Sequence, residues 1–273
     1  TATSGSANGT AAVTVRTWAS VSGGTDHTCG VNWAGQAYCW GQNSYGHLGD
    51  RTTTLRTTPV PVFGELSWTS VGSGHHHSCG MTTEGKAYCW GLGSLGNASY
   101  AVSYEPVPVE GTSRFTPGLI YASVNVGSKH NCGVTAAGEA YCWGDENHYG
   151  QIGDGTNGDH AARAWPTLVN GGLTWASVSL GRWHTCGVTT SGEAYCWGRN
   201  DTGQVGDGTN TDRSEPVLVN GGLTWASVSL GWEHTCGVTT AGEAYCWGNN
   251  ASGELGDGTN TDRTEPVLVN GGL

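Results

Sequence analysis

The sequence predicts an all-β protein, a β-propeller of five four-stranded blades, and three observations support this prediction. One fifteen-residue pattern occurs five times, most clearly as HTCGVTTSGEAYCWG over 184–198 and HTCGVTTAGEAYCWG over 234–248. Looser copies begin at His27, His77 and His130, so that successive copies start 50 to 54 residues apart, a spacing typical of propeller blades and solenoid turns. Within a repeat the apolar residues alternate or form short runs, and no helical period appears.

The fourth repeat shows how each element is assigned. Residues 175–179 alternate between apolar and polar and are predicted as the first strand, and residues 184–189 as the second. A Gly-containing turn then leads to a third strand over 193–198. A long loop rich in Gly, Asp, Asn and Thr follows, and residues 216–219 form the last strand, where the initial proline suits an edge or first position. Four short antiparallel strands per repeat are typical of a propeller blade.

The repeats are expected to form one domain. A single repeat cannot bury its own apolar face and must stack on its neighbours. We therefore predict a five-repeat propeller domain over 12–273, preceded by an N-terminal leader over 1–11. Residues 12–15 resemble the last strand of a blade, and the final copy of that strand lies at 266–269, so five repeats come with six such strands. The additional strand could add to an edge, overlap where a ring closes, or pair with the next molecule.

Composition excludes several classes of function. The formal net charge of −11 argues against a nucleic-acid partner, which requires a surface rich in Lys and Arg. No segment approaches the roughly 18 apolar residues of a membrane-spanning helix. The chain begins at Thr1 with neither Met nor a basic segment, so we expect that any signal peptide has been removed or omitted.

Ten cysteines form five pairs, each ten positions apart and flanking a predicted hairpin turn. Residues that face each other across such a ladder have Cβ atoms about 4.5–5.5 Å apart, close to the reach of a disulfide bond. Zinc sites usually contain a CxxC-like knuckle, which the chain lacks. We predict five disulfides, with reduced buried thiols as the alternative, and therefore a secreted, extracellular protein. The predicted pairs are Cys29–Cys39, Cys79–Cys89, Cys132–Cys142, Cys186–Cys196 and Cys236–Cys246.

Three features together resemble the regulator-of-chromosome-condensation repeat: the WG that ends each copy, the following GQ-[VI]-GDGT loop and the PV-x-V strand. The resemblance extends from about Val13 to Val269. It implies a β-propeller, usually of seven blades, so five copies leave closure of the ring by one chain undecided. Nucleotide exchange on a small GTPase, the activity of the nuclear namesake, is not expected of an acidic chain with predicted disulfides. The secreted bacterial type, similar in architecture to β-lactamase inhibitory protein II, suits the compartment better, and it binds an enzyme through aromatic-rich loops on one face.

Residues that recur in every repeat are expected to serve the framework. The histidine that opens each copy could belong to a ring of metal ligands, but its repetition favours a structural hydrogen bond. The GDGTNTDR loops at 206–213 and 256–263 contain oxygen atoms that could bind calcium, but their spacing does not match the EF-hand loop, and Asp, Asn and Thr also form turns without an ion. The triplet over 75–77 cannot easily hold one metal ion, because adjacent strand residues point to opposite faces.

Residues that differ between repeats are the better candidates for binding. The two positions before the recurring histidine vary most, and in a ring they would lie together on one face. We select as binding residues Asp26, His76, Lys129, Arg182, Trp183, Trp232 and Glu233. Trp and Arg are the residues most enriched among interface anchors, although ordinary drift of loop sequences is the alternative. The long loops over 42–58, 92–105 and 145–165 also differ and could form a second surface.

We find no GxSxG or HExxH motif and no paired carboxylates outside the repeated framework, and therefore expect no enzymatic activity, cofactor or metal. Two functions remain. The first is an extracellular structural or interaction protein that self-assembles into filaments through its terminal strand. The second is a soluble binding module or inhibitor that grips a protein or a glycan through variable loops on one face. The expected partner is thus another protein, a second copy of the chain or a glycan.

Overall fold

The computed structural model describes residues 17–113, 118–158 and 161–271, and every regular element in these ranges is a β-strand. The strands form five antiparallel sheets of four, each in simple chain order from the first strand to the fourth. The five four-stranded blades predicted from the sequence are therefore confirmed. The first two blades contain β1 (Trp18–Gly23), β2 (His27–Asn32), β3 (Ala37–Gly41), β4 (Arg56–Pro61), β5 (Trp68–Ser73), β6 (His77–Thr82), β7 (Ala87–Gly91) and β8 (Ser103–Pro108). The last three contain β9 (Tyr121–Val126), β10 (His130–Thr135), β11 (Ala140–Gly144), β12 (Arg163–Leu168), β13 (Trp175–Leu180), β14 (His184–Thr189), β15 (Ala194–Gly198), β16 (Arg213–Leu218), β17 (Trp225–Leu230), β18 (His234–Thr239), β19 (Ala244–Gly248) and β20 (Arg263–Leu268).

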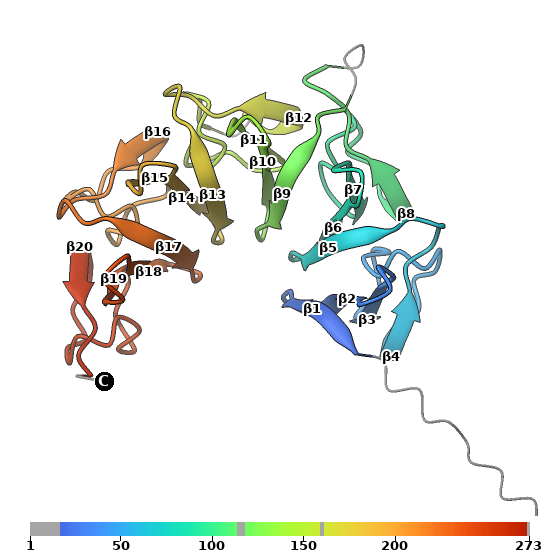
Figure 1. Ribbon diagram of the computed structural model, residues 1–273, viewed down its shortest axis with the longest axis horizontal. Coiled ribbons are helices and arrows are strands. Elements are labelled where there is room, and N and C mark those ends of the chain that lie inside the picture. Colours follow the sequence, from blue (N-terminus) through green and yellow to red (C-terminus); the bar gives the residue numbers. More distant parts are fainter. Residues whose placement is uncertain (1–16, 114–117, 159–160, 272–273) are drawn as a thin grey trace, which may run out of the picture.

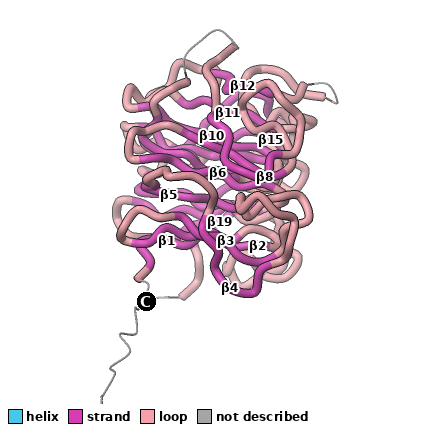
Figure 2. The backbone as a smooth tube through the Cα atoms, turned by 90° about the vertical axis from the view of Figure 1, so that its right-hand side faces the viewer, coloured by secondary structure: helices cyan, strands magenta, loops and turns pink. Residues whose placement is uncertain are grey.

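The blades are arranged side by side in an arc, with the first strand of each blade toward the centre and the fourth on the rim (Figure 1). The first and fifth blades lie at the two ends of this arc (Figure 1). Seen from the side, the strands cross the middle of the molecule and the loops gather on its two faces (Figure 2). In the described residues no helix is long and apolar enough to cross a membrane.

The outermost strand of a blade differs from its prediction. In the fourth blade it runs from Arg213 to Leu218, three residues earlier than expected, because Arg213 pairs with Gly198 at the end of β15. Pro216 therefore lies inside the strand, and its position on an outer strand leaves one edge unpaired, where a missing N–H is tolerated. The predicted extra strand over 12–15 falls outside the described residues.

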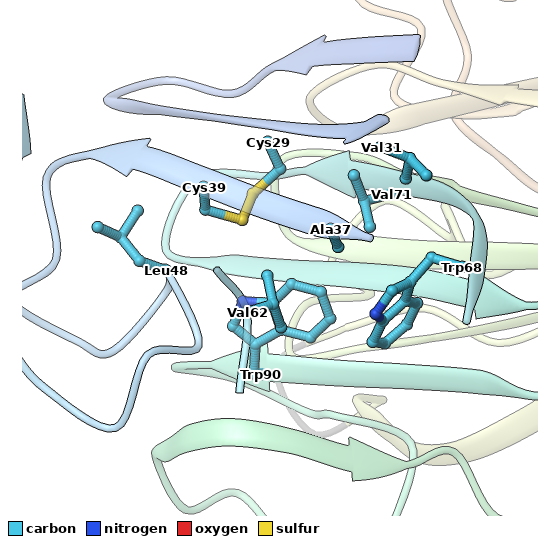
Figure 3. Close-up of a cluster of buried hydrophobic side chains, with 9 residues drawn as sticks. All are labelled: Cys29, Val31, Ala37, Cys39, Leu48, Val62, Trp68, Val71 and Trp90. Atoms are coloured by element: carbon cyan, nitrogen blue, oxygen red, sulfur yellow. A yellow bond between two sulfur atoms is a disulfide. The ribbon is translucent and has the colours of Figure 1, made fainter. Parts of the chain in front are cut away.

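The core consists of similar apolar layers between successive blades. Figure 3 shows the layer between the first two, in which a disulfide and small side chains of one blade pack against the tryptophans of the next. The WG tryptophans of the second to fifth blades are fully buried in such layers: Trp90, Trp143, Trp197 and Trp247. Within a blade the glycine of the HTCGV segment is also required, since a Cβ at Gly187 on β14 would lie 2.6 Å from the ring of Trp175 on the adjacent β13. Packing within and between blades thus explains the residues that recur most regularly in the repeat.

All five predicted disulfides are present, and the prediction is confirmed. Their Cα–Cα distances are 4.0 to 4.1 Å, and each pair is directly opposed across the second and third strands of its blade. No free cysteine occurs in the described residues. The bridges of the first four blades lie in the apolar layers between blades, where they contribute to packing as well as to the covalent framework.

Candidate binding face

The recurring histidines connect one blade to the next. In the first four blades the Nε2 atom lies within hydrogen-bond distance of a polar side chain one repeat later, while the ring itself is buried. These contacts are His27 to Ser78 Oγ at 2.8 Å, His77 to Asn131 Oδ1 at 2.8 Å, His130 to Thr185 Oγ1 at 2.7 Å and His184 to Thr235 Oγ1 at 2.9 Å. The framework role expected from repetition therefore takes the form of an inter-blade hydrogen bond.

Burial keeps these rings neutral. It lowers the pKa of His27, His130 and His184 to about 3, with nearby histidines adding to the effect. Burial also lowers the pKa of His77, against the opposing effect of its hydrogen bond to Asn131. A neutral imidazole can form the hydrogen bond to the next blade, whereas a charged ring in this buried layer would lose its solvation by water.

The Asp-containing loops are held by their own side chains. Asp207 Oδ1 accepts hydrogen bonds from the backbone N (3.0 Å) and the hydroxyl (2.8 Å) of Thr209, and Oδ2 accepts one from Arg213 Nε at 2.7 Å. The same pattern recurs at Asp50, Asp154 and Asp257. Across 17–113, 118–158 and 161–271, no group of three His, Cys, Asp or Glu side chains could hold a metal ion. The hydrogen bonds of Asp207 show that its oxygen atoms stabilise the turn.

The histidine triplet is divided between two environments. His75 and His76 stack with ring centroids 3.7 Å apart and are half-buried, whereas His77 is buried and bonded to Asn131. The three rings therefore do not form a single set of ligands.

The five variable pairs lie on the same face of the arc, because each occupies the loop from the first strand of a blade to its second. These loops surround a depression of about 330 Å³ that residues of all five blades line. Arg182 and Trp232 are part of this lining, together with glycines such as Gly74 and Gly181. The sequence prediction of one shared face is consistent with this geometry, and we call it the loop face.

Aromatic rings and guanidinium groups alternate across the loop face. The Arg182 Cζ atom lies 3.8 Å from the ring centroid of Trp183 and 4.4 Å from that of Trp232. The Arg199 Cζ atom lies 4.8 Å from the ring of Trp183 and 5.6 Å from that of Tyr149. We call these five residues the Trp–Arg ladder. Each such contact is favourable through the ring quadrupole, so the side chains hold one another in place before any partner arrives.

Carboxylates pair with two of the three cations in this region. Arg199 Nη1 lies 2.6 Å from Glu233 Oε1, and Lys129 Nζ lies 3.4 Å from Glu146 Oε1. Within the described part of the chain, Arg182 has aromatic neighbours but no carboxylate partner. Its guanidinium donors are therefore the ones left to meet an acidic group of a ligand.

The first two blades extend the face with further aromatic rings. Tyr45 lies over His76 with centroids 4.8 Å apart, and His76 stacks on His75. Partial burial lowers the pKa of both histidines, so they are neutral at ordinary pH. Asp26 is exposed beside them. The predicted binding residues are thus spread over all five blades, and the closest contacts among them join Arg182, Trp183 and Trp232.

Sequence reasoning missed the ladder residues Tyr149 and Arg199, together with Tyr45 and Glu146. They belong to loops after the third strand, of which 42–58 and 145–165 were assigned to a second surface. Because the strands are antiparallel, the third strand of a blade ends on the same face as the first. The residues just after each WG therefore adjoin the variable pairs, and their differences between repeats were the available indication.

Comparison with known proteins finds similar sequences and similar structures. The model of the RCC1-like domain matches residues 16–273. The E3 ubiquitin-protein ligase HERC2 of Homo sapiens is 27% identical over 198 residues, which are 69% of this chain and 4% of that protein. Human WBSCR16 superposes with a TM-score of 0.79 at 21% identity, covering 92% of this chain and 66% of that one. Prp20p from Saccharomyces cerevisiae superposes with a TM-score of 0.58 at 18% identity, covering 93% of this chain and 77% of that one.

The two structural matches agree on the fold, and the chain spans only a small part of HERC2. The bacterial secreted type remains a prediction. The match over 16–273 includes all five blades, and the chain therefore belongs to the family of RCC1-like domains.

Proposed function

We propose that this chain is a non-enzymatic extracellular interaction protein that binds a protein partner through the Trp–Arg ladder of its loop face. One observation carries the proposal. The framework residues repeat in all five blades, whereas the ladder draws residues from positions where the blades differ. Selection for folding alone does not require a row of alternating aromatic and guanidinium groups beside an open depression.

The ladder has the properties of an interface centre. Trp, Tyr and Arg are the residues that contribute most to binding energy in protein interfaces. Trp232 has 61% of its surface exposed although it belongs to a cluster of rings. Since Arg182 and Arg199 already contact these rings, ordering the side chains on binding costs less than it would for separate residues.

The relatives support a protein as the partner. Yeast RCC1, Prp20, has been crystallised with Kap60 bound, and Prp20p has been studied for its binding to Gsp1p and histones. We carry over the capacity to bind proteins, not these particular partners. The ligase activity of HERC2 belongs to a protein of which this chain matches 4%. Five disulfides support an extracellular location, because such bonds persist in oxidising compartments.

The test removes two rings of the ladder and keeps a matched control. The double variant Trp183→Ala/Trp232→Ala is compared with Trp33→Ala. Trp33 is 75% exposed in the turn after β2, at the opposite end of its blade. Immobilised proteins are incubated with the extracellular proteins of the source culture, and retained species are identified and titrated. We expect the double variant to bind about 100-fold more weakly, given about 1.4 kcal/mol, or a factor of about ten, per anchor, and Trp33→Ala to bind as the wild type does. Equal binding by all three proteins would refute the proposal. Retention of a glycan and of no protein would show that the partner is a glycan.

Self-assembly is a second candidate function, and the apolar faces that the described residues leave exposed on the two terminal blades favour it. In the first blade Val21 is 54% exposed, and in the fifth Val238 is 40% exposed, whereas their equivalents in the fourth blade are 3% exposed. Assembly through the predicted strand over 12–15 is tested by deleting residues 1–16 and measuring particle size. Unchanged assembly would exclude a donated strand.

A further inference from the structure

Each contact between successive blades joins two different surfaces. One blade presents its disulfide with a valine and an alanine, and the next presents the tryptophan and valine of its first strand. Between the fourth and fifth blades these residues are Val188 and Ala194 on one side and Trp225 and Val228 on the other. We call the first surface the leading face and the second the trailing face.

A polar connection accompanies the apolar one. The carbonyl oxygen of Gln204 in the fourth blade accepts hydrogen bonds from the Thr235 hydroxyl and the Trp247 indole of the fifth, both at 3.0 Å. His184 of the fourth blade completes the group through its 2.9 Å contact with Thr235. The same geometry occurs one interface earlier, where Thr185 and Trp197 both donate to the Gln151 carbonyl at 2.9 Å.

Among the described residues, none covers the leading face of the fifth blade. Val238 is 40% exposed and Ala244 is exposed, while the equivalent Val188 and Ala194 are 3% and 1% exposed. The surface is chemically the same as that of the fourth blade, since both contain HTCGVTT and GEAYCWG.

The first blade has the matching trailing face. Val21 is 54% exposed, whereas Val228 of the fifth blade, at the same position, is 9% exposed. Its first strand begins WASVS, identical to residues 225–229. Thr28 and Trp40 occupy the positions of Thr235 and Trp247 and thus provide the same two donors.

We propose that copies of this chain associate head to tail, the leading face of the fifth blade in one copy receiving the trailing face of the first blade in the next. This interface would pair the same residue types as the contact between the fourth and fifth blades, with the neighbouring copy displaced along the ring axis. Thr28 and Trp40 of one copy would donate to the Glu254 carbonyl of its neighbour, and His234 would bond to Thr28. The proposal rests on self-assembly, the second candidate function, and requires neither the loop face nor the strand over 12–15.

The geometry of the arc sets the form of the assembly. The two faces lie at opposite ends of one molecule (Figure 1), so each is presented to a neighbour. The contact is heterologous, and such a contact produces either a closed ring or an open filament. A second copy has five blades, more than the open part of the arc accommodates (Figure 1), so successive copies step along the ring axis and form a helix.

Two charge insertions test the proposal on the full chain. Val21→Arg blocks the trailing face and Val238→Arg blocks the leading face. Both side chains are exposed in the isolated molecule, so folding should be preserved, which circular dichroism checks. Leu168→Arg is the matched control, since this leucine is 48% exposed on an outer strand away from both faces. Sedimentation velocity over a concentration series and electron microscopy measure assembly.

We expect wild type and Leu168→Arg to assemble with rising concentration and each face variant to associate at least 100-fold more weakly. An equimolar mixture of the two face variants should stop at dimers, because each retains one intact face of opposite kind. A wild type that stays monomeric at every concentration would overturn both this inference and self-assembly. Assembly that is abolished by deleting residues 1–16, but unaffected by either face variant, would overturn this inference and leave self-assembly standing.

Discussion

Acidification to about pH 5 should destabilise the fold by several kcal/mol through its inter-blade histidines. His27, His130 and His184 have a pKa of about 3 in the folded chain because they are buried. In the unfolded chain the pKa of a histidine is about 6.5. A lowered pKa means that the folded state binds fewer protons, so the free energy of unfolding is highest above about pH 6.5 and falls as the pH decreases toward 3.

The magnitude follows from proton linkage. At about pH 5 each of these histidines is protonated in the unfolded chain but stays neutral in the folded one. Proton binding therefore favours the unfolded chain and lowers the free energy of unfolding by about 2 kcal/mol per residue. Three such residues give about 6 kcal/mol, a large part of the total stability of a typical domain. His47, whose pKa burial lowers to about 4, acts in the same direction. Asp257 does not interfere, because its pKa is lowered to about 2 and it titrates in a more acidic range.

The assay is guanidinium unfolding followed by tryptophan fluorescence, with disulfides intact, at several values between about pH 5 and 7.5. His184→Gln keeps a neutral group able to donate to Thr235, and it should reduce the loss on acidification by about 2 kcal/mol. His148→Gln, at an exposed position, is the control and should show the wild-type loss. A stability that does not change over this pH range, or an unchanged dependence in His184→Gln, would refute the reasoning.

Two other consequences concern the covalent and polar framework. Replacing Cys186 and Cys196 together by Ala removes a bridge with a sequence separation of 10, and loop-closure entropy predicts a loss of about 3 kcal/mol, measurable as a lower midpoint of thermal unfolding; an unchanged midpoint would contradict it. Asp207→Ala leaves the Thr209 and Arg213 donors without their acceptor and should cost about 1–3 kcal/mol. Millimolar calcium should leave the wild-type midpoint unchanged, and a calcium-dependent rise would instead show that these loops bind the ion.

The repeat made the architecture accessible to sequence reasoning. Strand order and the cross-strand pairing of cysteines follow from patterns that are visible within one repeat, and the five-blade count follows from the number of copies. The partner of His130 could not be deduced in the same way, since Thr185 lies one repeat later and meets it only after the blades stack. Each recurring histidine is nevertheless followed by Thr, Ser or Asn, and this regularity was the available indication.

The binding face was only partly predicted, and the reason is similar. Arg182, Trp183 and Trp232 departed from the repeat and were selected on that basis. Arg199 and Tyr149 come from loops after the third strand, and their contact with Trp183 depends on the packing of neighbouring blades. The early start of β16 at Arg213 was missed because its pairing with Gly198 follows a register shift that the sequence does not display.

The most direct measurement of the proposed function compares the extracellular proteins retained by wild type, Trp33→Ala and Trp183→Ala/Trp232→Ala under identical non-reducing conditions. Quantitative mass spectrometry of the retained fractions should show at least one protein that binds the first two and is depleted about 100-fold on the third. Equal retention of every protein by all three would contradict binding through the Trp–Arg ladder.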